Sequence, residues 1–246
     1  MKRIAIFLLV IALAIPTLFS CGMPDEDSNL QTGLPNVNLQ QLTPVQSVAA
    51  MYKVSQPTKV VAATKQVIIQ DYLELEGKYE IVTGYVDNTP ASVYKIQTEE
   101  IRSVDEGGQN DEVKDIVKTT NKVIEAIEGK GSRTNGGEWN AEGTVWTIGR
   151  GRMAINLKDD LVKDVTYEDH KLSFTVPQAN AAKVLGEEYA ANIDSDIAIV
   201  IVDDGAVVVS IELSYYIAAN EEANLGRSEM YIKVDYTYDI ERITIE

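Results

Sequence analysis

The chain has 246 residues, 45% of them hydrophobic, so it is long enough to bury a substantial core. It carries 22 basic and 38 acidic residues, which gives a formal net charge of −16. Because phosphate contacts need clustered Lys and Arg, this balance argues against nucleic acid and anionic lipid surfaces as partners. We interpret the acidic excess as a source of solubility and of repulsion between neighbouring molecules, with cation binding as the alternative.

The first 21 residues have the organisation of an export signal. Lys2 and Arg3 form a basic start, residues 4–14 are apolar, and Leu18-Phe19-Ser20-Cys21 follows Pro16. A transmembrane anchor is one alternative, but the apolar stretch is shorter than the ~20 residues that span a bilayer. A plain cleaved signal that leaves Cys21 as a free thiol is another. Cys21 is the only cysteine, which argues against a disulfide framework.

The Leu-x-Ser-Cys ending resembles the lipobox of bacterial lipoproteins. This resemblance implies cleavage between Ser20 and Cys21, removal of residues 1–20 as a signal peptide, and attachment of a diacylglyceryl group to Cys21. Two or more acyl chains hold a protein stably at a membrane. We therefore expect a protein anchored by lipid to the extracytoplasmic side of the cell membrane.

Residues 21–41 are expected to form a flexible, acidic tether. They contain Pro24, Pro35 and the acidic cluster Asp25-Glu26-Asp27, and they show no apolar periodicity. Residues 42–246 are then predicted to form a single α+β domain. Two similar halves that divide near residue 150 are the alternative.

The first structured element is predicted to be a helix that begins at Thr43-Pro44, an N-cap followed by proline, and ends before Pro57. Its apolar residues recur at helical spacing, at Val45, Val48, Ala49 and Tyr52. From residue 58 to residue 104 the apolar period changes to two. With a turn at Asp87-Asn88-Thr89-Pro90, this pattern predicts a meander of long antiparallel strands.

A longer helix is predicted over residues 111–128, where Asp111 and Glu112 would lie at its N-terminus and Gly129 would end it. We expect Ile124 to be buried against the sheet. The apolar face of this predicted helix consists of Val113, Ile116, Val117, Thr120, Ile124 and Ile127. A glycine-rich loop over residues 129–143 and a strand from Trp146 to Ile148 follow.

The second half of the chain is predicted to repeat this pattern. The expected elements are a strand at 153–157, a hairpin of 162–167 and 171–176, a helix at 177–185, a hairpin of 197–202 and 206–217, and a strand at 229–240. The last strand alternates most regularly, which is typical of a sheet with one packed and one solvated face. A change of phase at Glu241-Arg242 predicts a bulge.

No residue set predicts catalysis, a metal site or a cofactor. His170 is the only histidine and lies in an expected turn, where a solvated surface role is the simplest interpretation. Without a second histidine or a free cysteine, a structural zinc site of nitrogen and sulfur ligands cannot form. No Gly-x-Ser-x-Gly motif is present. We therefore predict a protein that is not an enzyme.

Four short motifs and one group of tyrosines need an interpretation. Gly129-Lys130-Gly131-Ser132 and Gly149-Arg150-Gly151-Arg152 are too short for phosphate or dinucleotide loops. Asp194-x-Asp196 and Asp203-Asp204-Gly205 do not continue into a calcium-binding loop. For the late tyrosines we expect packing on strands, with a carbohydrate or ligand platform as the alternative; they are Tyr215, Tyr216, Tyr231, Tyr236 and Tyr238.

The order of predicted elements indicates one curved antiparallel sheet covered by a few helices. This pattern resembles the half-barrel of the lipoprotein-carrier and LprG-type lipoproteins over residues 43–246. The resemblance implies a non-enzymatic binding protein with an apolar or small ligand between sheet and helices. A structural or protein-interaction lipoprotein without a ligand pocket is the alternative. Tyr85, Val209 and Tyr236 should decide between them, by lining a void or by being packed.

Overall fold

The computed structural model describes residues 42–68, 73–105, 112–141, 153–220, 226–238, 241–243 and 245. The predicted signal peptide, Cys21, the tether and the predicted strand at Trp146 lie outside these residues. Within the described residues, no helix is both long enough and apolar enough to cross a membrane.

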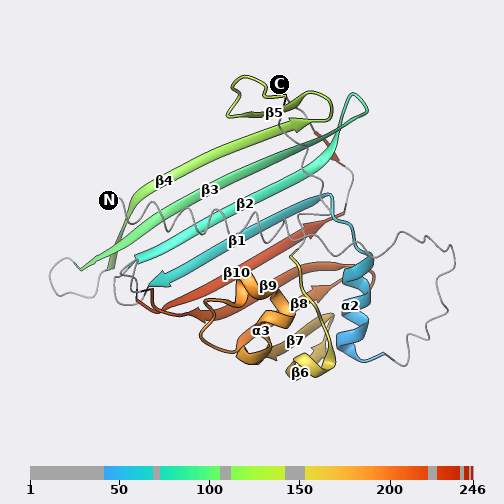
Figure 1. Ribbon diagram of the computed structural model, residues 1–246, viewed down its shortest axis with the longest axis vertical. Helices are drawn as coiled ribbons and strands as arrows, with labels where there is room; N and C mark the ends of the chain where they lie inside the picture. The colour runs from blue at the N-terminus through green and yellow to red at the C-terminus, as the bar shows by residue number, and fades with distance from the viewer. Residues whose placement is uncertain are drawn as a thin grey trace.

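One large open sheet contains all the strands that the structure describes (Figure 1). In sequence order they are β1 (Lys59–Ile68), β2 (Leu73–Val86), β3 (Thr89–Asp105), β4 (Glu112–Ile127), β5 (Gly131–Thr134), β6 (Lys163–Glu168), β7 (Lys171–Val176), β8 (Ile197–Asp203), β9 (Val208–Ile217), β10 (Ser228–Thr237) and β11 (Glu241–Arg242). Their spatial order is β5-β4-β3-β2-β1-β10-β9-β8-β7-β6, and neighbours along this path are antiparallel. Pairing of β1 with β10 joins strands from both sides of residue 150 in one sheet.

Among the described residues the α-helices are few and short. They are α2 (Pro44–Val54), α3 (Ala181–Leu185) and α4 (Glu187–Ala190). The predicted start of α2 is confirmed. The Thr43 hydroxyl accepts a hydrogen bond from the Gln46 amide at 3.1 Å, and the Gln46 side chain accepts one from the Thr43 amide at 3.3 Å. This reciprocal cap, with Pro44 in the first turn, satisfies amide groups that a helix end otherwise leaves unpaired.

The predicted meander from residue 58 to residue 104 is confirmed as β1, β2 and β3. Asp87 and Asn88 connect β2 to β3 with φ angles of +48° and +65°. A two-residue turn with positive φ at both positions matches the twist of the flanking strands. The hairpins β6–β7 and β8–β9, the short helix before Gly186 and the last long strand are confirmed as well.

The predicted helix over residues 111–128 is wrong. Residues Glu112–Ile127 form β4, which pairs along its length with β3. Half of its 16 residues are Val, Ile or Thr, whose branched side chains favour strands. The β3–β4 register shifts between Glu100 and Ile101, which interrupts the simple alternation. Ile124 lies on this strand and is half-buried against the core, and Gly129 belongs to the β4–β5 turn.

Two smaller predictions also differ from the structure. Residues 153–157 do not form a strand, although Met153 and Leu157 are buried in the core. The change of phase at Glu241-Arg242 reflects a separate short strand, because β11 pairs in parallel with β2 beside Gly84 and Tyr85. A chain that leaves β10 and crosses to another strand restarts its alternation there.

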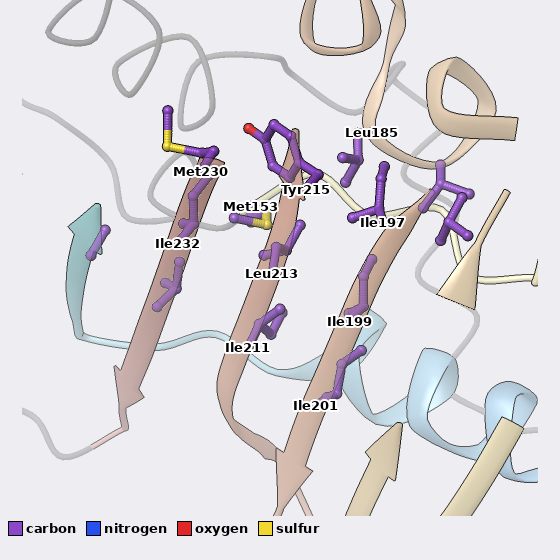
Figure 2. Packing of buried hydrophobic residues seen from close by; sticks show 14 of the residues in the cluster. Met153, Leu185, Ile197, Ile199, Ile201, Ile211, Leu213, Tyr215, Met230 and Ile232 are labelled. Carbon is purple, nitrogen blue, oxygen red and sulfur yellow. The ribbon is translucent and has the colours of Figure 1, made fainter. Parts of the chain in front are cut away.

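The two faces of the sheet differ in what covers them. We call the inner face the one that packs against α2 and α3, and the outer face the opposite one. Figure 2 shows inward side chains of β8, β9 and β10 in neighbouring columns. These side chains form one core with Val45 and Val48 of α2 and with Leu185 of α3. The columns are Ile197, Ile199 and Ile201 on β8, Ile211, Leu213 and Tyr215 on β9, and Met230 and Ile232 on β10.

Candidate binding groove

The outer face carries a groove of about 670 Å³. Its lining side chains come from two neighbouring cross-strand rows that run over β3, β2, β1, β10, β9 and β8. The first row is Gln97, Lys78, Ala63, Lys233, Glu212 and Val200. The second row is Glu99, Glu76, Lys65, Tyr231, Ser214 and Ala198. Because strands lie ~4.8 Å apart, rows over six strands extend about 24 Å across the sheet.

Small residues interrupt the long side chains of each row. Ala63 lies between Lys78 and Lys233 in the register, and Ala198 lies beside Ser214 at the β8 end. Both alanines are exposed. A methyl side chain between two lysines leaves open space above the sheet, which the long neighbours enclose as walls. The hollow therefore follows from side-chain size at positions that the strand register brings together.

Ion pairs hold two of the groove lysines, Lys65 and Lys233, in place. Lys65 Nζ lies 2.7 Å from Glu74 and 3.4 Å from Glu76, and Lys233 Nζ lies 3.0 Å from Glu212. The hydrogen bond to Glu74 raises the pKa of Lys65, and the hydrogen bond to Glu212 raises the pKa of Lys233. Such exposed pairs add little stability, but they orient the side chains that line the groove.

Tyr231 is the aromatic side chain of the groove, and it is 44% exposed. Its hydroxyl donates a hydrogen bond of 2.6 Å to Glu229, whose other carboxylate oxygen accepts one from the Tyr216 hydroxyl. The two hydroxyls lower the pKa of Glu229. In turn, the Glu229 carboxylate raises the pKa of Tyr216 and of Tyr231, since it stabilises their protonated forms.

The substitution Glu229→Gln is expected to lower the pKa of both Tyr216 and Tyr231 toward that of free tyrosine. A neutral amide does not oppose the formation of a phenolate. Ultraviolet titration of tyrosinate at alkaline pH measures this shift. Glu212→Gln is the control, because Glu212 pairs with Lys233 and with no tyrosine in the described contacts. Unchanged ionisation of both tyrosines in Glu229→Gln would contradict the hydrogen bonds.

On the inner face, three buried polar atoms have no hydrogen-bond partner among the described residues. They are Thr64 Oγ1, Gln66 Oε1 and the Tyr79 hydroxyl. Thr64 and Tyr79 flank Gly77: a Cβ at residue 77 would lie 2.7 Å from Thr64 Oγ1 and 2.8 Å from the Tyr79 hydroxyl. Burial raises the pKa of Tyr79 to about 12. An unpaired buried polar atom costs about 1–3 kcal/mol, so a ligand that pairs with these atoms would gain that energy.

His170 lies in the β6–β7 turn with its side chain 60% exposed, as predicted. Its partner was not predicted from the sequence. Asp203 at the end of β8 is fully buried, and its carboxylate lies 3.0 Å from His170 Nδ1. It also accepts hydrogen bonds from the Tyr167 hydroxyl at 3.0 Å and from the Gly205 amide at 2.8 Å. Asp203 therefore joins two hairpin turns, which is a structural role.

The aspartates considered for calcium bind protein groups. Asp196 accepts hydrogen bonds from Lys163 and from the Gln178 amide, and Asp194 accepts one from Arg227. The Asp204 carboxylate accepts hydrogen bonds from the Val207 and Ala206 amides, and these bonds lower the pKa of Asp204. In the part of the chain that the structure describes, no group of three or more His, Cys, Asp or Glu residues could hold a metal ion.

The first of the two glycine motifs is part of a β-hairpin. Gly129-Lys130-Gly131-Ser132 runs from the β4–β5 turn into β5, and Lys130 Nζ is 4.0 Å from the centre of the Trp139 ring. Gly149-Arg150-Gly151-Arg152 lies outside the described residues. Among the tyrosines, Tyr215 and Tyr236 are buried in the core as expected for strand packing, whereas Tyr231 is exposed in the groove.

Tyr85, Val209 and Tyr236 do not line one void. Tyr85 is 53% exposed at the end of β2, and Val209 is half-buried. Tyr236 is packed in the core, with its hydroxyl 3.0 Å from that of Tyr52. None of the three lines the groove. The residues expected to decide the function are therefore not part of the site.

No protein-family model matches this sequence, and no curated protein matches it. Among solved structures, a DUF1329 family protein from Desulfovibrio piger aligns with 80% of this chain and 92% of its own. The sequence identity is 8% and the TM-score is 0.24. That similarity is too low to assign a function. The fold and the groove thus define an open antiparallel α+β protein with a polar groove on the outer face of its sheet.

Proposed function

We propose that the protein is a non-enzymatic binding protein, tethered to the extracytoplasmic side of the cell membrane through lipid on Cys21, whose small ligand occupies the outer groove. The groove carries this proposal. Its volume of about 670 Å³ falls in the range of small-molecule sites, and ion pairs at Lys65 and Lys233 hold its walls. A site that is already formed loses little entropy when a ligand binds.

The groove is a better site than the space between the helices and β7–β10. Inward side chains such as Ile199, Ile211 and Leu213 fill that space and pack against α2 and α3 (Figure 2). The resemblance to half-barrel lipoproteins supports a binding role but places the ligand on the inner face. The outer position proposed here rests on the groove alone.

The substitution Ala63→Trp tests this proposal. An indole at the centre of the groove would fill the space between Lys78 and Lys233 and exclude a ligand. A panel of small soluble compounds is screened by thermal shift against the purified protein. Compounds that stabilise the native protein should fail to stabilise Ala63→Trp. Val165→Trp, at an exposed site on edge strand β6, is the matched control and should respond as the native protein does.

The substitution Cys21→Ala tests the tether. Without the lipobox cysteine no diacylglyceryl group can be attached, and the variant should move from the detergent phase to the aqueous phase in a Triton X-114 partition. Native protein remains in the detergent phase. Partition of Cys21→Ala with the native protein would overturn the lipid anchor, and it would leave the groove unaffected.

A second candidate ligand is an apolar molecule with one polar group, bound on the inner face. The unpaired atoms of Thr64, Gln66 and Tyr79 favour it, because buried Ile68 and Leu75 lie beside them on β1 and β2. Such a ligand would co-purify and be detected by mass spectrometry. Its loss from Gln66→Leu but not from Ala63→Trp would assign it to the inner face.

A further inference from the structure

We propose that the ligand of the outer groove is a neutral oligosaccharide that lies across the strands. This inference rests on the proposed function and gives its ligand a chemical class. Four properties of the groove support it: shape, charge balance, hydrogen-bonding groups and one exposed aromatic ring.

The shape fits a single unbranched chain. A volume of about 670 Å³ distributed over a length of about 24 Å corresponds to a mean cross-section of about 28 Å². This section matches one extended chain that lies along the groove. Because the rows run across six strands, the chain would lie roughly perpendicular to the strand direction.

The charge balance favours a neutral ligand. Three lysines and three glutamates line the groove, so the lining is neutral although the whole chain carries −16. Lys65 and Lys233 are already paired with glutamates. An anion would be repelled by Glu76, Glu99 and Glu212 and by the net negative charge of the protein. A cation would be repelled by the three lysines. A neutral ligand leaves the ion pairs in place.

The hydrogen-bonding groups favour hydroxyls over other neutral groups. Lysine side chains only donate and carboxylates only accept, whereas a hydroxyl does both and can pair with either. Gln97 and Ser214 add mixed groups to the lining. A peptide would fit less well, since β2, β1, β10 and β9 are interior strands whose backbones pair on both sides. No free strand edge is available there for its amide groups.

The exposed ring of Tyr231 provides a flat apolar surface. Its hydroxyl is held by Glu229 at 2.6 Å, which orients the ring without covering it. Sugar rings present carbon-bound hydrogens on one face and hydroxyls around the edge. The face can pack on Tyr231 while the edge reaches the charged side chains. An aromatic residue with one polar group can therefore contact both the apolar face and the polar edge of a sugar.

Isothermal titration calorimetry of the purified, detergent-solubilised protein tests the inference. The probes are linear hexasaccharides of glucose, of N-acetylglucosamine and of mannose, with a uronic-acid hexasaccharide and a neutral hexapeptide for comparison. At least one neutral sugar should bind, and Tyr231→Ala should weaken it about tenfold through loss of ring contact. Tyr231→Phe, which keeps the ring, should bind nearly as the native protein does. Tyr167→Ala, an exposed tyrosine outside the groove, should bind equally well.

Four outcomes would overturn the inference. Preferential binding of the uronic-acid chain or of the peptide would assign another class of ligand. Equal loss of affinity in Tyr231→Ala and Tyr167→Ala would mean that the sugar does not lie on Tyr231. Failure of all neutral sugars, together with another compound whose binding Ala63→Trp abolishes, would reject the oligosaccharide and retain the groove. Failure of every compound in both assays would reject the groove as well.

Discussion

Replacement of Ile211 by alanine is expected to lower the free energy of unfolding by about 2–5 kcal/mol, because it removes buried methylenes and leaves a cavity. Ile211 has no exposed surface. It lies at the centre of the inner face, with Val234 of β10 and Ile201 of β8 as its cross-strand neighbours. Its position in the core places it among side chains that cannot move far to fill a void (Figure 2).

Denaturant unfolding, followed by circular dichroism, measures this loss. Glu212→Ala is the matched control, because Glu212 is the next residue on the same strand and points to the outer face. Its exposed ion pair with Lys233 should be worth less than about 1 kcal/mol. Similar losses in the two variants would contradict the assignment of the inner face as the core.

The second large effect is expected for Asp203→Ala, which should cost about 2–4 kcal/mol. Its fully buried carboxylate accepts hydrogen bonds from the Tyr167 hydroxyl and the Gly205 amide and contacts His170 Nδ1. Hydrogen bonds to a charged group are stronger than neutral ones, and removal of the acceptor leaves donors unpaired. The β6–β7 and β8–β9 turns would then lose the residue that joins them.

Thermal unfolding and amide exchange at Gly205 measure this effect. His170→Ala and Tyr167→Phe each remove one interaction and should each cost less than Asp203→Ala, since both partners reach solvent and water can replace them. A loss in His170→Ala as large as that in Asp203→Ala would show that Asp203 acts through the histidine alone.

The misassignment of β4 has a physical explanation. Val113, Ile116, Val117, Thr120, Ile124 and Ile127 satisfy helical spacing, and no glycine or proline interrupts them. The inward positions of β4 that face Glu100, Thr98 and Ile96 are Lys118, Thr120 and Lys122, so no apolar alternation marks the strand. The branched side chains were the available signal for a strand. Pairing with β3 then outweighed the helical spacing of the apolar residues.

The groove illustrates the same limit at the candidate site. Alternation in the last strand correctly predicted that Tyr231 and Lys233 lie on one face and Ile232 and Val234 on the other. It contained no information on what lies beside them. The hollow exists because Ala63 of β1 pairs with Lys233 of β10, residues that are 170 positions apart. A one-residue slip of that register would turn all these side chains to the other face.

Local patterns were sufficient for features that a few neighbouring residues decide. The Thr43-Pro44 helix start, the Asp87-Asn88 turn, the β8–β9 hairpin and the alternation of β10 were all predicted from short stretches of sequence. In each case the capping group, the positive φ angle or the period of two acts within about ten residues.

Tertiary structure decided the features that join distant segments. Pairing of β1 with β10 made one sheet from both halves of the chain, placed two rows of side chains around Ala63, and left the outer face free of the described helices. Burial of Asp203 between two hairpins has the same origin. The partner strand is selected by the packing of inward side chains from both halves of the chain in one core with α2 and α3. This is a non-local free energy that no short window of sequence contains.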